Sequence, residues 1–240
     1  MVAGGGVRAA NHSQNGSTAH PRAPFDQLVR SAEGERWRLP SPEGATLSEL
    51  FASARDGGAM GFLLAQLPRG KPLLWVQERM AMLEAGRIYP PGLGVPELIH
   101  VAARDARDAL WAMEEGLRCS ALGAVIGESW GDPKALDFTA TRRLAVAAER
   151  NGVAAYLIRL GGHANLSGAR MRWRVASAPS IAHPLDPKAP GASAWDAELF
   201  RARGFAPGRW IIRHEGAADR FGLVAAAGDR ALVEGQRRVG

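Results

Sequence analysis

The feature that most constrains the fold is a regular alternation of short apolar runs with amphipathic segments through the middle of the chain. Continuous apolar runs of this length predict buried strands, and they lie at 73–76, 98–101, 122–126 and 153–160. They recur roughly 20–30 residues apart, the spacing expected when a helix crosses over between parallel strands. We therefore expect an α/β fold with a mostly parallel central sheet.

Two of the intervening segments predict amphipathic helices. Residues 105–117 place Ala109, Leu110 and Met113 at helical spacing, with charged residues largely on the other side. A second helix is expected to begin after Asp137, a residue type favoured at the N-cap, and to end at Gly152. An earlier apolar run at 47–52 is followed by a glycine-rich turn and a third helical pattern.

The C-terminal part has a different pattern. Large apolar and charged residues alternate at 170–178, 195–203 and 209–215, which is typical of strands with one solvent-facing side. Pro207 and Gly208 lie between the last two segments and predict a hairpin turn, and 221–225 predicts one further strand. We expect these strands to extend the parallel sheet in antiparallel fashion.

The ends of the chain suggest domain boundaries. Residues 1–24 have almost no large apolar side chains, so we expect a disordered arm, followed by a short amphipathic stretch at 25–39. A single domain is predicted for 25–225 and a flexible tail for 226–240. The first residues lack a signal-peptide pattern, the apolar runs are far shorter than the ~18 residues of a membrane span, and Cys119 is the one cysteine. These features predict a cytoplasmic protein without a membrane segment.

A parallel α/β sheet prompts a search for a phosphate-binding loop, which needs glycines followed by lysine and a hydroxyl residue at a helix start. The pair Gly70-Lys71 does not qualify, because Pro72 and a strand follow it. The expected position, 55–62, keeps three glycines, Gly57, Gly58 and Gly61, but has neither the lysine nor the hydroxyl. ATP hydrolysis there would lack its main charge stabilisation.

Other catalytic patterns are not found either. Glu128 follows the 122–126 strand, where a metal-organising acid would stand, but without the loop a surface glutamate after a strand is the favoured interpretation. The six histidines form no cluster with metal-ligand spacing, and no Gly-x-Ser-x-Gly motif occurs. We therefore predict no catalytic residue, metal or cofactor, and a protein that is not an enzyme.

The net charge of +6 comes from an arginine-rich composition and fits a nucleic acid or an acidic partner without establishing either. In a strand, Arg170, Arg172 and Arg174 project to one face and Trp173 to the other. This row is a candidate contact for phosphates or for an acidic protein surface. An ordinary solvated sheet face above a tryptophan in the core remains an equal alternative.

Several ordered motifs together resemble the ImuA family, RecA-like accessory proteins of damage-induced mutagenesis. They lie at 73–77, 86–93, 109–118, 136–144, 172–175, 195–203 and 207–210, within a match that covers about 45–225. The resemblance implies a RecA-like three-layer core without a working nucleotide site. It also implies a role in translesion synthesis in the SOS response, with ImuB as partner and with an error-prone C-family polymerase and RecA as further contacts.

On the RecA pattern, the loop 161–168 matches the second DNA-binding loop, and Arg159 lies near a nucleotide-sensing position. Aromatic residues often dominate interfaces, so we expect partner contacts around Trp195, Phe200, Phe205 and Trp210. The leading hypothesis is a non-catalytic binding subunit. The alternatives are a module that binds single-stranded DNA through the loop and arginine row, and a residual ATPase.

Overall fold

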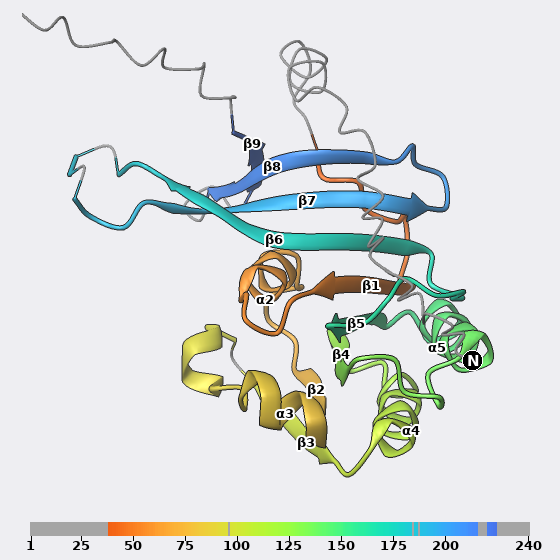
Figure 1. Cartoon of the computed structure of the whole chain (residues 1–240). Coiled ribbons are helices and arrows are strands. Elements are labelled where there is room, and N and C mark those ends of the chain that lie inside the picture. The colour runs from red at the N-terminus through yellow and green to blue at the C-terminus, as the bar shows by residue number, and fades with distance from the viewer. Residues whose placement is uncertain (1–37, 96, 184, 187, 216–219, 225–240) are drawn as a thin grey trace, which may run out of the picture.

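The computed structural model describes residues 38–224, with gaps at 96, 184, 187 and 216–219 (Figure 1). Strands and helices first alternate and are then replaced by consecutive strands. In chain order the elements are β1 (Leu47–Ala52), α2 (Gly58–Leu64), β2 (Leu73–Glu78), α3 (Arg79–Ala85), the 3-10 turn η1 (Pro90–Leu93), β3 (Leu98–Ala103), α4 (Ala106–Gly116), β4 (Ala124–Trp130), α5 (Phe138–Asn151), β5 (Ala154–Leu160), β6 (Met171–Ile181), β7 (Ala192–Ala202), β8 (Gly208–Glu215) and β9 (Arg220–Leu223).

All nine described strands form one sheet in the order β3-β2-β4-β5-β1-β6-β7-β8-β9. Pairing is parallel from β3 to β6, and β7, β8 and β9 then add in antiparallel fashion. The predicted α/β class, with a mostly parallel sheet and an antiparallel C-terminal extension, is confirmed. β1 lies inside the sheet between β5 and β6, so the end of β1 is surrounded by other strand ends.

Helices cover both faces of the parallel part, which explains why its strands are apolar on both sides. On one face α4 packs on β2, β3 and β4, while α5 packs on β1 and β5. On the other face α3 packs on β2 and β4, and α2 packs on β1, β6 and β7. We call these the α4/α5 face and the α2/α3 face. Each face has its own core, one around Leu144 and Met113 and the other around Trp75 and Phe62.

The predicted caps of α5 are present, and α4 also begins at an aspartate cap. The Asp105 carboxylate accepts hydrogen bonds from two amides of the first turn of α4, and the Asp137 carboxylate accepts one from Ala140 at the start of α5. Gly152 ends α5 in the left-handed conformation, with φ of 69°. The short helix α3 was not predicted, because its polar start at Arg79 reads as the end of a strand.

A short crossover joins β5 to β6. Both strands run parallel to β1, so residues 161–170 return from one end of the sheet to the other. The Gly168 amide donates to the Thr141 hydroxyl of α5, and a Cβ on Gly168 would lie 2.5 Å from the Arg142 Cα. Only glycine therefore allows the crossover to lie this close to α5.

The predicted arm 1–24, most of the 25–39 stretch and the tail 226–240 lie outside the described residues. The helices that the structure describes are all too short or too polar to cross a membrane.

Candidate functional site

The β1–α2 loop lies where a RecA-like fold would hold a nucleotide, and two of the three glycines predicted there serve packing. Gly57 is the N-cap of α2, with open space around the position of a Cβ. A Cβ on Gly58 would lie 2.5 Å from the backbone nitrogen of Ser177 in β6. A Cβ on Gly61 would lie 3.1 Å from the Trp195 indole nitrogen. Gly58 and Gly61 thus allow α2 to lie directly on β6 and β7.

An acidic side chain occupies the start of α2. The Asp56 carboxylate accepts hydrogen bonds from the Gly58 amide at 2.8 Å and the Ser177 amide at 2.9 Å, and a third from the Ser177 hydroxyl. Burial opposes the charge, but these hydrogen bonds outweigh it and lower the pKa of Asp56. At neutral pH the loop therefore carries a negative charge, and it contains no lysine.

Glu128 is part of a closed hydrogen-bond network. Its carboxylate is 2% exposed and accepts from the Trp75 indole at 2.5 Å and the Gln77 amide at 3.0 Å. Gln77 in turn accepts from the Ile88 amide and contacts His100. Burial raises the pKa of Glu128 in spite of its two donors. The interpretation as a surface glutamate is wrong, because β4 continues to Trp130 and places this residue inside the sheet.

Arg172 and Arg174 lie on one face of β6, as predicted, but with Arg170, which stands just before the strand, they do not form an open row. Arg172 is 3% exposed, and its Nε donates to Glu49 of β1 at 2.7 Å. The two flanking arginines also pair with acids, Arg170 with Glu149 and Arg174 with Glu198. The interpretation of all three as an ordinary solvated face is wrong at Arg172, since β1 is a neighbouring strand and supplies a buried carboxylate.

Arg159 belongs to the same buried network. It is 3% exposed, and it lies 3.6 Å from the Glu49 carboxylate and 2.7 Å from that of Asp132. Asp132 also accepts from the amide and ring of His163 in the crossover. Burial opposes ionisation of Asp132, but the bonds from His163 and the charge of Arg159 lower its pKa. Asp132 thus links His163 of the crossover to Arg159 of β5.

Aromatic rings complete this network. The Arg159 and Arg172 guanidinium carbons lie 5.4 and 5.2 Å from the centre of the Phe51 ring, and Arg172 lies equally near Phe200. Three polar atoms in it lack a hydrogen bond within the described residues, Glu49 Oε1, Arg159 Nε and Arg172 Nη2. Sequence reasoning missed Glu49 and Asp132. A lone glutamate in the apolar 47–52 run was the available signal for Glu49.

A cavity of about 530 Å³ borders the network at the ends of β1 and β5. Ion pairs balance the charges on its wall, because Arg174 pairs with Glu198, Arg209 with Asp196, and His163 with Asp132. The wall therefore has no excess of positive charge with which to hold a polyphosphate.

The four aromatic residues expected at an interface do not form one surface. Trp195 is 5% exposed and packs edge-on against Phe62, while Trp210 contacts Trp173, all on the α2/α3 face. Phe200 lies on the opposite face, with the Arg174 guanidinium over its ring, and Phe205 is in the β7–β8 turn with 37% exposed. The prediction of an exposed Trp195 is wrong, because the alternation of β7 directs it toward α2.

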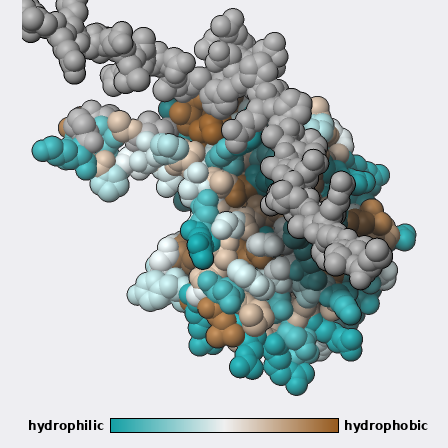
Figure 2. Space-filling model, in the orientation of Figure 1, coloured by the Kyte–Doolittle hydropathy of each residue, from teal (hydrophilic) through white to brown (hydrophobic). Residues whose placement is uncertain are grey.

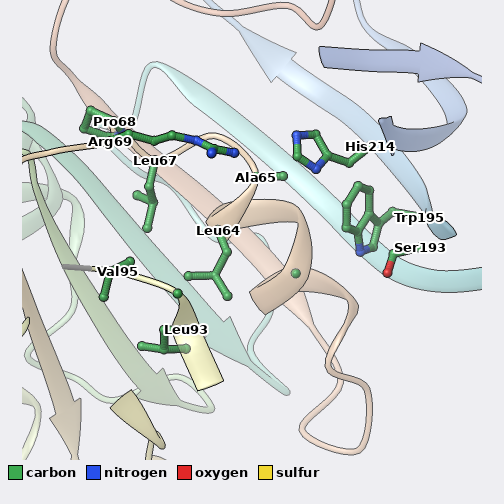
Figure 3. A pocket seen from close by; sticks show the side chains of 12 residues that line it. Leu64, Ala65, Leu67, Pro68, Arg69, Leu93, Val95, Ser193, Trp195 and His214 are labelled. Carbon is green, nitrogen blue, oxygen red and sulfur yellow. The ribbon is translucent and has the colours of Figure 1, made fainter. Parts of the chain in front are cut away.

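Trp195 does reach the edge of a groove of about 530 Å³ beside α2 (Figure 3). In Figure 3, Leu64, Leu67, Leu93 and Val95 lie on one side and Trp195, Ser193 and His214 on the other, with Arg69 above α2. The groove is thus lined on one side by the α2 and η1 segments and on the other by the β7–β8 hairpin.

The strand order, the helices on both faces and a glycine loop after β1 define a RecA-like α/β domain, here with aspartate instead of lysine in the loop. No family model matches the sequence. Protein ImuA from two strains of Caulobacter vibrioides is 34% identical over 189 residues, which cover 72% of this chain and 74% of each relative. The chain belongs to the ImuA family.

Proposed function

We propose that the chain is a non-catalytic accessory subunit of a bacterial error-prone translesion synthesis complex. Membership of the ImuA family supports a role in damage-induced mutagenesis. The observation that carries the proposal of no catalysis is the Asp56 carboxylate, which accepts a hydrogen bond from the first amide of α2. The proposed setting is the cytoplasm during the SOS response.

The physical reason to propose no catalysis is the charge of the β1–α2 loop. A triphosphate binds a loop through backbone amides, a lysine and a hydroxyl-bound Mg²⁺. Here Asp56 uses the Gly58 amide and adds a negative charge of its own, so phosphate would meet repulsion instead of a cation. Glu128, the acid nearest to a metal-organising position, is held by Trp75 and Gln77. Catalysis of phosphoryl transfer therefore lacks its central parts.

The proposed partner is ImuB, with an error-prone C-family polymerase and RecA as further contacts. We place the first contact on the α4/α5 face of β6–β8, where α2 is absent and Arg174 is 51% exposed beside Phe200. Phe205 lies at the turn of the same hairpin. Arginine beside an aromatic ring is a combination that often dominates binding energy.

Co-elution of the purified full chain with ImuB tests the proposal, with and without ATP and single-stranded DNA. We expect one complex under all of these conditions. The double variant Arg174→Glu/Phe205→Asp should weaken it, while Arg79→Glu/Leu83→Asp, which makes the same changes on the exposed side of α3, should not. Absence of any complex overturns the proposal, and equal binding by both double variants overturns the placement.

Single-stranded DNA binding stays a prediction for the crossover loop, where residues 163–166 are exposed. Arg159 and Arg172 are buried and therefore not accessible to DNA, so the prediction now concerns the loop and no longer the arginine row. A log-log salt slope near zero in a binding titration would contradict it.

A further inference from the structure

A hollow of about 680 Å³ lies between the end of α4 and the outward side of α5. These two helices pack against each other on the same face of the sheet (Figure 1). Four arginines surround the hollow, Arg118, Arg142, Arg143 and Arg150. The surface over α4 is mostly hydrophilic in Figure 2. None of the residues assigned above to the proposed function lines this hollow.

Two of these arginines already form ion pairs at the edge of the hollow. The Arg118 guanidinium lies 3.1 Å from Glu115, and that of Arg143 lies 2.7 Å from Glu114, both of α4. The pair of Arg143 joins α5 to α4, that of Arg118 is local to the end of α4, and together they neutralise half of the local positive charge.

The other two arginines are free. Arg142 and Arg150 are exposed, and the part of the chain that the structure describes offers neither of them an ion pair or hydrogen-bond partner. Glu149 is next to Arg150 in the sequence, but its carboxylate accepts from Arg170 and from Thr46. Two positive charges are therefore available on this side of α5.

An exposed apolar side chain lies between these charges. Val146 is 47% exposed and also lines the hollow. Arg142, Val146 and Arg150 follow each other at intervals of four residues, so they share one side of the helix, and at 1.5 Å per residue the two arginines are about 12 Å apart along the axis. The pattern is a positive charge, an apolar surface and a second positive charge.

We propose that this hollow docks an acidic helical segment of a partner protein. An apolar side chain of the segment packs on Val146, and one carboxylate pairs with each of Arg142 and Arg150. Carboxylates four residues before and after an apolar residue match this spacing on a partner helix. The inference deepens the proposed role as a binding subunit and rests on it.

The same observations favour a peptide over a nucleic acid. The two available charges are few for a phosphate backbone, because affinity for nucleic acid rises with the number of phosphates that are neutralised. Val146 at the centre has no apolar counterpart on such a backbone, whereas a protein helix supplies one.

The test is a fluorescence anisotropy titration of the full chain with a labelled helical peptide that places two glutamates eight residues apart around a central leucine. We expect saturable binding. Arg142→Gln/Arg150→Gln should weaken it about tenfold, equivalent to roughly 1.4 kcal/mol, while Arg55→Gln/Arg79→Gln, which removes the same charge from other exposed positions, should not. Circular dichroism checks that each variant is folded.

A charge swap makes the test specific to the pairing. The variant Arg142→Glu/Arg150→Glu should lose the acidic peptide and bind a peptide with lysines in place of the two glutamates. Absence of saturable binding, equal binding by the Gln variant, or binding of an oligothymidine at these arginines without the peptide overturns the inference. ImuB co-elution is scored separately, so failure of the docking surface and failure of the proposed function are distinguished.

Discussion

Asp56 is the residue that most changes what the β1–α2 loop can bind. Its carboxylate satisfies the Gly58 amide and holds Ser177 of β6 at the same time. One side chain therefore binds the first amide of α2 and joins this helix to β6.

Removal of this carboxylate should produce a pH-dependent loss of stability. Asp56→Ala should lower the free energy of unfolding at pH 7 by about 1 kcal/mol, because hydrogen bonds to a charged acceptor are lost. The pKa of Asp56 is lowered in the folded state, so its contribution is present above the ordinary value of 3.8 and is lost as the pH falls through the folded value. Urea unfolding at pH 7 and in steps below pH 4 measures this, and a difference that does not shrink in acid would contradict it.

At the scale of elements, α2 depends on a close approach to β6. Gly58→Ala should destabilise the chain by about 2 kcal/mol or more, because its Cβ would meet backbone atoms of Ala176 and Ser177 that cannot move independently. Gly57→Ala is the matched control, since the adjacent position is open and its φ of −73° suits alanine. Thermal unfolding compares the two, and equal effects would contradict a packing role.

Replacing Arg172 and replacing Arg174 should have different effects on stability in the same kind of experiment. Arg172→Met should cost about 3–5 kcal/mol, because it leaves Glu49 buried with a weaker partner, while Arg174→Met should cost less than about 1 kcal/mol as an exposed pair. Urea unfolding of both variants measures the difference. If the two variants lost equal stability, the buried network would not have the role described.

An element could be predicted from the sequence where local interactions determine it, and not where contacts between distant segments do. Helix α4 was predicted because its apolar residues recur at helical spacing, and α5 because Asp137 and Gly152 mark its ends through local interactions. The alternation of β6 indicated correctly that Arg172 and Trp173 face opposite sides. It could not indicate that Glu49, 123 residues away in the chain, would meet Arg172, because that contact depends on the order of strands in the sheet.

At the scale of the whole molecule, the two halves of the sheet are covered by helices to different extents. Helices enclose its parallel half on both faces, and the antiparallel half has α2 on one face (Figure 1). The binding surfaces that we propose, around Arg174 and around Val146, both lie on the α4/α5 side. A partner that used both would contact the chain across the crossover at 161–170.

Titration of the full chain with a fluorescent ATP analogue and Mg²⁺, followed by a phosphate-release assay, tests most directly whether function lies in these surfaces. We predict no saturable binding up to about 1 mM, the upper range in which working enzymes bind substrate, and no phosphate release. Saturable Mg²⁺-dependent binding with turnover would contradict the non-catalytic role.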